Sequence, residues 1–242
     1  MKDLRQPAGT IKALLLDMDD TIIADDPFTE KAWQVACSRY SRQTKGFDAK
    51  TLKLGIDEVR EVYWKDAERH RIGRLNLVQA RRDIVNQAFS RLGINEPKVA
   101  NELADLYTRE KERLCVPFPG ALEALKEFKA SGLRLALLTN GSSDIQRRKI
   151  NRFRLAQYFD HIFIEEELGV GKPDERVFRT ALEKLKATPG ESCMVGDDLE
   201  RDIAGAQKLG IFTVWVDLKK TGLPPKSSIK PDHIISSIIE LV

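Results

Sequence analysis

The sequence predicts an α/β protein in which a parallel β-sheet, covered by helices on both faces, is interrupted by a long all-helical segment. Short apolar runs alternate with amphipathic helical patterns from about residue 117 onward, which is typical of parallel strands linked by helices. Residues 24–116 instead show helical periodicity and almost no strand signal. We therefore expect two domains: a core formed by residues 1–23 and 117–242, and a helical domain formed by residues 24–116.

The first strand of the core is expected at residues 11–16, a mostly apolar run. The helical segment follows it. One apolar stripe with steps of three and four residues runs from Leu77 to Leu92, and a second runs from Val99 to Leu114. Such stripes indicate amphipathic helices, of which we expect about four. Because the segment leaves from the end of the first strand, we expect it to lie over the carboxyl edge of the sheet as a lid.

Strands and helices alternate after the helical segment. Pro119-Gly120 opens the first helix of this part, and Ser131-Gly132 ends it. The expected strands are residues 133–138, 161–164, 192–195 and 211–216, and the expected helices between and after them are residues 142–153, 174–185 and 200–209. The last segment, residues 233–241, is predicted to form a short strand and a closing helix.

The composition is that of an ordinary globular protein. With 242 residues and 42% hydrophobic content, the chain can bury a full core. Its 40 basic and 37 acidic residues give a formal charge of +3, too balanced to predict a nucleic-acid-binding protein. No apolar run is long enough to span a membrane, and the first ten residues lack the apolar centre of a signal peptide.

The three cysteines are Cys37, Cys115 and Cys193. They are odd in number, widely spaced and without a CxxC pair, which argues against a zinc site or a disulfide framework. We therefore expect reduced thiols and a cytoplasmic protein.

Two aspartates, Asp17 and Asp19, stand where the first strand ends. Alternation along an extended chain points both side chains to the same side. Two anions so close repel unless a proton or a cation neutralises them, and oxygen-only ligands favour a hard ion such as magnesium. A carboxylate held in this way can also attack phosphorus. Taken alone, the same cluster with Thr21 is equally consistent with a turn and a helix cap.

Two further polar clusters follow later strands. Thr139, Asn140 and Gly141 combine a hydroxyl, an amide side chain and backbone N–H groups at a helix start, which suits a phosphate group. The same residues could serve only as a cap or turn. Lys172, in a Gly-Lys-Pro loop before a helix, could balance both a phosphate and the aspartates with one ammonium group. The alternative is an exposed loop lysine.

A fourth cluster comprises Asp197, Asp198 and Asp202, behind the strand at residues 192–195. Asp197 is placed as a metal ligand, and Asp202 could orient the lysine or a metal-bound water. Asp198 could simply cap the following helix, because acidic residues are favourable there. All four clusters follow different strands, as a site at the carboxyl edge of a parallel sheet requires.

In order, Asp17-Met18-Asp19-Asp20-Thr21, Thr139, Lys172 and the segment from Gly196 to Asp202 resemble the four motifs of the haloacid dehalogenase-like (HAD) hydrolase superfamily. The resemblance covers residues 11–216 apart from the helical segment, which is similar to the helical cap of the family's first cap class. It implies a Rossmann-like core. Details of the second and fourth motifs, with Thr213-Val214-Trp215, resemble the branch of acylneuraminate phosphate phosphatase and pyrimidine nucleotidase. The chain also resembles the phosphoglycolate phosphatase branch.

The resemblance implies a magnesium-dependent phosphatase. Asp17 would be the nucleophile that forms an aspartyl phosphate, and Asp19 would be the general acid and then the general base. Magnesium would be held by the side chains of Asp17 and Asp197 and by the carbonyl of Asp19. The phosphate oxygens would be held by Thr139, Asn140, Gly141 and Lys172. Thr21, Asp198 and Asp202 would be supporting residues of the site.

Residue 19 separates the activities within this superfamily, because true dehalogenases resemble this chain but lack the second aspartate. A phosphomutase of the β-phosphoglucomutase kind shares both aspartates and stays open. A catalytically idle binding or regulatory member would need a lost catalytic group, and none is lost here. The expected substrate is a small phosphorylated metabolite, with sugar phosphate, nucleoside monophosphate and phosphoglycolate all open. The sequence does not indicate an oligomeric state.

Overall fold

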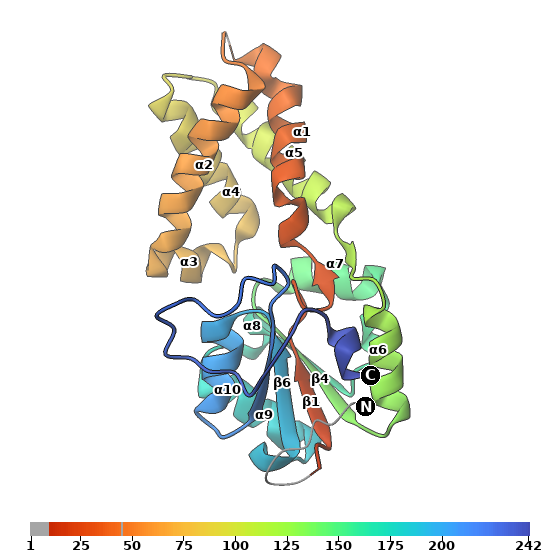
Figure 1. Ribbon diagram of the computed structural model, residues 1–242. Helices are drawn as coiled ribbons and strands as arrows, with labels where there is room; N and C mark the ends of the chain where they lie inside the picture. Colours follow the sequence, from red (N-terminus) through yellow and green to blue (C-terminus); the bar gives the residue numbers. More distant parts are fainter. Residues whose placement is uncertain (1–9, 45) are drawn as a thin grey trace. The chain divides into compact units, whose positions relative to one another are not determined.

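The computed structural model describes residues 10–44 and 46–242 (Figure 1). The described chain forms two compact units. One unit contains the chain up to Ala24 together with Val116–Val242, and the other contains Asp25–Cys115. Each is described separately below.

The first unit is built on a six-stranded sheet with the order β5-β4-β1-β6-β7-β8. Its five strand pairings are all parallel. The strands are β1 Ala13–Leu16, β4 Arg134–Thr139, β5 His161–Ile164, β6 Ser192–Gly196, β7 Phe212–Val216 and β8 His233–Ile235. The parallel α/β core predicted from the sequence is confirmed.

β1 lies inside the sheet between β4 and β6, and all four of its residues are fully buried. An apolar strand of this kind needs cover on both faces. In Figure 1, helices flank the sheet on both sides. From β1 the strand order runs through β4 to β5 in one direction, and from β6 through β7 to β8 in the other. Such a reversal opens a crevice at the carboxyl ends of the strands on either side of it, here β1 and β6.

Helices of the first unit cover this sheet. They are α6 Ala121–Ala130, α7 Ser143–Arg152, α8 Glu165–Leu168, α9 Glu175–Leu185 and α10 Gly205–Gln207, with 3-10 turns at Leu155–Gln157, Pro189–Glu191 and Ile238–Leu241. The apolar face of α9 packs against the strands. Phe178 and Ala181 of this helix belong to one buried cluster with Leu15 and Met194. Burial of these side chains holds α9 against the sheet. The loop that carries Lys172 comes directly before this helix in the chain.

The helix predicted at residues 200–209 differs from the observed structure. Residues 200–209 were expected to form one α-helix, but a π-helical segment, Leu199–Ala204, precedes the short α10. The carbonyl of Asp198 accepts from the N–H groups of both Asp202 (2.9 Å) and Ile203 (3.3 Å), and the second bond widens the turn. The widened turn follows Asp197 and Asp198 in the chain, at the carboxyl edge of the sheet.

A two-stranded antiparallel ribbon, β2 Ile23–Ala24 with β3 Val116–Pro117, also went unpredicted. Strands of two residues carry no periodicity that could reveal them. β2 and β3 are the points at which the chain leaves and re-enters the first unit.

Among its described residues, the second unit has helices as its regular secondary structure. It contains α1 Thr29–Tyr40, α2 Ala49–Lys65, α3 Ala67–Gly73, α4 Leu77–Arg91 and α5 Pro97–Leu114, with 3-10 turns at Asp26–Phe28 and Ser41–Gln43. The two apolar stripes read from the sequence lie along α4 and α5. One buried cluster contains several members of each stripe, namely Ile84, Ala88, Phe89, Val99 and Leu103. Asp48, Asp66 and Asn76 cap helices by accepting from backbone N–H groups.

Four side chains stack on one another within this helical unit. The rings of Trp33 and Tyr107 are parallel, with centroids 3.7 Å apart. Arg60 lies over the Trp33 ring and Arg81 over the Tyr107 ring. Each contact adds a cation–π attraction to the burial of the rings.

Among the described helices of the chain, none is long and apolar enough to cross a membrane.

Candidate active site

The polar clusters predicted from the sequence meet at the carboxyl edge of the sheet. They surround a cavity of about 150 Å³. Its lining residues are Asp17, Asp19, Asp20, Thr139, Asn140, Lys172, Asp197, Asp198, Arg201 and Asp202. Two predicted site residues, Thr21 and Gly141, are not among them.

Lys172 lies between two carboxylates. Its Nζ is 2.6 Å from Asp17 Oδ1 and 2.7 Å from Asp202 Oδ1, and the residue is only 2% exposed. The two carboxylates outweigh the cost of burial and raise the pKa of Lys172, so its ammonium stays charged. Lys172 is therefore a buried charge at the site rather than an exposed loop lysine.

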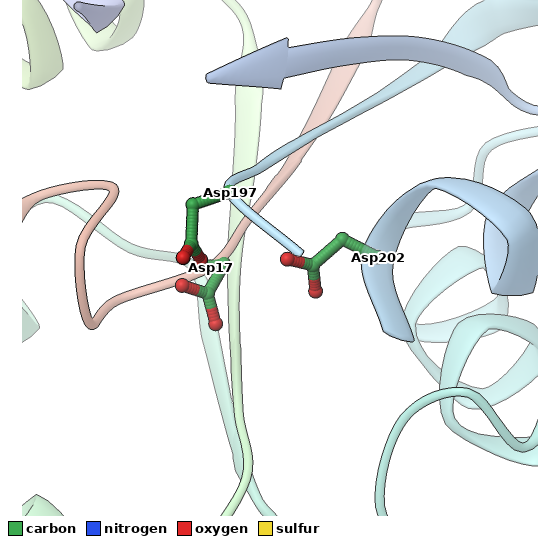
Figure 2. Close-up of side chains that lie close together, drawn as sticks. All are labelled: Asp17, Asp197 and Asp202. Carbon is green, nitrogen blue, oxygen red and sulfur yellow. The ribbon is translucent and has the colours of Figure 1, made fainter. Parts of the chain in front are cut away.

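Three carboxylates converge beside this lysine. Figure 2 shows Asp17, Asp197 and Asp202 with their carboxyl groups turned toward one another, and one oxygen from each lies within 4.8 Å of the others. Burial, reinforced by the charges of Asp17 and Asp202, raises the pKa of Asp197 to about 9. Burial also raises the pKa of Asp17 to about 6, against the lowering effect of Lys172.

This carboxylate cluster fits a divalent cation. The cluster has three acidic side chains and one ammonium group, which pairs with two of them, so it holds more negative than positive charge. The donors are all oxygen, the ligand type that Mg²⁺ takes in proteins. The carboxylate of Asp19 is not part of this cluster. The sequence-based hypothesis assigned the main-chain carbonyl of Asp19 to the metal, and that assignment stays a prediction.

Asp198 and Asp202 have different environments. Asp198 accepts from the N–H groups of Glu200 and Arg201 and from the guanidinium of Arg201, so it caps the π-helical segment, which was one of its two expected roles. Asp202 accepts from the N–H of Asp198 at 3.1 Å through the oxygen that does not face Lys172. A Cβ at residue 196 would lie 2.2 Å from this oxygen, so the close approach requires Gly196.

Asn140 holds the main chain of Lys172. Its Nδ2 donates to the Lys172 carbonyl, and its Oδ1 accepts from the Lys172 N–H, both at 2.8 Å. The amide group therefore fixes the point at which the Lys172 side chain leaves the main chain.

The N–H of Gly141 donates to Glu165 Oε2 at 2.9 Å. The predicted contacts of Asn140 and Gly141 with phosphate stay predictions.

Asp19 is bound by two residues that the sequence did not single out. Gln146 Nε2 donates to Asp19 Oδ2 at 2.9 Å, and Lys149 Nζ lies 2.7 Å from Asp19 Oδ1. Gln146 also donates to Thr139 Oγ1 at 2.5 Å. Gln146 is a polar residue on the buried side of α7, together with Ile145 and Ile150. Its polar side chain at a buried helix position is the sequence signal that could have revealed this role.

Comparison with known proteins settles the family. Residues 11–210 match the haloacid dehalogenase-like hydrolases, and the matched region contains every predicted site residue. The chain belongs to the haloacid dehalogenase-like hydrolases.

Curated relatives of this HAD-like hydrolase include several phosphatases. The phosphoserine phosphatase of Thermus thermophilus is 33% identical over 250 residues, which cover 96% of this chain and 98% of that one. The pyrimidine 5'-nucleotidase of Escherichia coli is 30% identical over 230 residues, 94% and 95% of the two chains. The N-acylneuraminate-9-phosphatase of Rattus norvegicus is 41% identical over 110 residues, 45% and 44% of the two chains. These relatives support a phosphatase enzyme.

Solved structures of HAD proteins share the fold. The magnesium-bound putative HAD-hydrolase YfnB of Bacillus subtilis superposes with a TM-score of 0.71 at 23% identity, covering 96% of this chain and 97% of that one. At that identity the likeness concerns the fold alone.

The helical unit of this HAD-like hydrolase contains a second cavity, of about 180 Å³. It is lined by Asp26, Thr29, Trp33, Arg60, Trp64, Leu77, Arg81, Ile84 and Tyr107.

Proposed function

We propose that this chain is a magnesium-dependent phosphatase that hydrolyses a small phosphomonoester through an aspartyl-phosphate intermediate. One observation carries the proposal. The buried Asp17 carboxylate, directly after the central strand, lies 2.6 Å from the Lys172 ammonium and beside the carboxylates of Asp197 and Asp202. A nucleophile, a phosphate-binding cation and a donor set for a divalent ion thus line one cavity.

In the first step, an oxygen of Asp17 attacks the phosphorus. The new bond joins this oxygen to phosphorus, and the bond from phosphorus to the substrate oxygen breaks. The leaving alkoxide takes a proton from Asp19 in its protonated form. The two residues line the same cavity, which supports this division of roles.

In the second step, water attacks the phosphorus of the aspartyl phosphate and gives a proton to Asp19. The bond between phosphorus and the Asp17 oxygen breaks, so that inorganic phosphate leaves and both aspartates return to their starting states. One residue therefore serves as acid in one step and as base in the next.

Charge balance is the main demand of this chemistry, because a phosphate dianion must approach several carboxylates. Lys172 supplies one positive charge, and the Thr139 hydroxyl offers a hydrogen bond to a phosphate oxygen. Asp17 and Asp197 would hold magnesium through their side chains, and Asp19 through its carbonyl. When bound, the ion supplies the positive charge that this acidic site lacks.

Two other functions remain as alternatives. A phosphomutase would use the same aspartates but return the phosphoryl group to a sugar, so it would release little inorganic phosphate. A catalytically idle member would lack at least one catalytic group, whereas Asp17, Asp19, Thr139, Lys172 and Asp197 all line the cavity. These five residues favour an active enzyme.

We propose a small phosphorylated metabolite as substrate, of the sugar phosphate, nucleoside monophosphate or phosphoglycolate type, and a reducing, cytoplasmic setting. Cys37, Cys115 and Cys193 are all buried free thiols, which fits such a setting.

The proposed function is tested by measuring inorganic phosphate released from a panel of phosphorylated metabolites. We expect release with Mg²⁺ from at least one ester, and loss of it with EDTA or in Asp17→Asn. Release that persists in either condition would contradict the mechanism. A phosphoryl group moved between positions of a sugar, without net phosphate, would indicate the mutase instead.

A further inference from the structure

Gln146 of α7 connects two groups of the proposed active site. Its Nε2 lies 2.9 Å from Asp19 Oδ2, 2.5 Å from Thr139 Oγ1 and 3.0 Å from the Asn140 carbonyl. The residue is 3% exposed. A side chain buried to this extent holds its partners in a fixed geometry.

The chemistry of these partners fixes the orientation of the Gln146 amide. The Asp19 carboxylate and the Asn140 carbonyl only accept hydrogen bonds, so the NH₂ end must face them. The NH₂ group has two hydrogens for three acceptors, so at least one hydrogen is shared between two of them. Because an amide nitrogen accepts no hydrogen bond, the Thr139 hydroxyl cannot donate to Gln146 and keeps its own proton for another acceptor. In the proposed reaction, that acceptor is a phosphate oxygen.

Lys149 binds the remaining oxygen of Asp19. It follows Gln146 by three residues on α7, so both side chains leave the same face of the helix. Its Nζ lies 2.7 Å from Asp19 Oδ1, and its side chain is 12% exposed. Both oxygens of Asp19 are therefore held from one helix.

We propose that Gln146 and Lys149 are positioning residues that hold the acid/base Asp19 and the Thr139 hydroxyl in one geometry. The inference rests on the proposed function, because it concerns the proton that Asp19 gives to the leaving group. Neither residue lines the cavity, so each acts through Asp19 or Thr139. A misplaced catalytic group can cost about 10²-fold in rate.

A leaving-group comparison separates positioning from a general structural role. The leaving group of 2,4-dinitrophenyl phosphate departs readily without a proton, whereas that of 2-glycerophosphate needs one. We expect kcat/KM for 2-glycerophosphate to fall about 10²-fold in Gln146→Leu and Lys149→Met, with a much smaller change for 2,4-dinitrophenyl phosphate. Lys149→Arg should restore most of the loss because it keeps a cationic donor.

Arg147→Met is the matched control. Arg147 lies between the two residues on α7, but its guanidinium binds Glu167 rather than Asp19. Its kcat/KM should be unchanged for both esters. Equal losses on both esters in Gln146→Leu and Lys149→Met, or no loss, would overturn the inference.

A second measurement does not depend on activity. In crystal structures of Gln146→Leu and Lys149→Met, the Asp19 carboxylate should leave the position it has in the wild type, and in Arg147→Met it should stay. If wild-type protein hydrolyses neither any panel metabolite nor either ester of the leaving-group comparison, the proposed function fails, while these structures still decide the positioning. An unmoved Asp19 in both variants would overturn it.

Discussion

The Lys172 ammonium lies 2.6 Å from a carboxylate oxygen of Asp17, although 155 residues separate the two in sequence. One residue follows the central strand β1, and the other stands in the loop before α9. Their contact brings the first and third sequence motifs together in a buried ion pair. Both the stability of the folded protein and the proposed chemistry depend on this ion pair.

Lys172→Met should destabilise the protein strongly. The change leaves the carboxylates of Asp17 and Asp202 buried without their cation, and breaking a buried ion pair costs about 3–5 kcal/mol. Urea unfolding measures the loss. Lys12→Met is the control, because the Lys12 side chain in its pair with Glu191 is 57% exposed and such pairs contribute about 0–1 kcal/mol. Similar losses in the two variants would show that Lys172 is not a buried partner.

Gly196→Ala should disturb Asp202. The added Cβ would lie 2.2 Å from Asp202 Oδ2, and overpacking of this kind costs about 1–3 kcal/mol. We expect lower stability and weaker phosphatase activity in the variant. Gly190→Ala is the comparison, since its Cβ would meet no atom within 4 Å and should change stability by less than about 0.5 kcal/mol. Wild-type activity in Gly196→Ala would be the unexpected result.

The cysteines should be unreactive in the folded protein. All three are buried, burial raises the pKa of Cys37 to about 12, and burial also raises the pKa of Cys193. The thiolate, which is the reactive form, is therefore scarce at neutral pH. A coloured disulfide reagent should label no thiol rapidly in native protein and all three in denaturant. Rapid labelling of native Cys37 or Cys193 would be inconsistent with these buried positions.

Trp33→Ala should destabilise the helical unit. Trp33 is 1% exposed and stacks on Tyr107, and removing a buried tryptophan ring costs about 3–5 kcal/mol. Thermal unfolding followed by circular dichroism measures the effect. Trp33→Phe keeps a ring against Tyr107 and should lose less, while Val62→Ala, at an exposed position of α2, should be near neutral. An Ala variant as stable as wild type would show that the stack carries little energy.

Much of the core could be predicted because its signals are local. The first strand was recognisable from Leu14 and its apolar neighbours, since a strand buried on both faces needs no polar alternation. The carboxyl ends of parallel strands meet at one edge, so Asp17, Thr139 and Asp197 could be brought together from their positions behind strands. The cavity lining contains all three.

What escaped prediction depends on contacts between distant segments. Gln146 binds Asp19, 127 residues away, and Glu165 binds the N–H of Gly141, 24 residues away. No periodicity marks such partners. The widened turn behind Asp198 was missed for a related reason, because residues 200–209 carry an ordinary helical pattern while Asp202 is held by Lys172 and the Asp198 N–H.

The proposed covalent step has one direct readout. Asp19→Asn should still be phosphorylated by 2,4-dinitrophenyl phosphate with Mg²⁺, because that leaving group needs no acid, but it should lose the base that the second step requires. Acid quenching and mass spectrometry should find one phosphoryl group on the peptide that carries Asp17, and none when Asp17→Asn is added. Phosphate release from active protein without any phosphorylated Asp17, or with the phosphoryl group on another residue, would rule out Asp17 as the nucleophile.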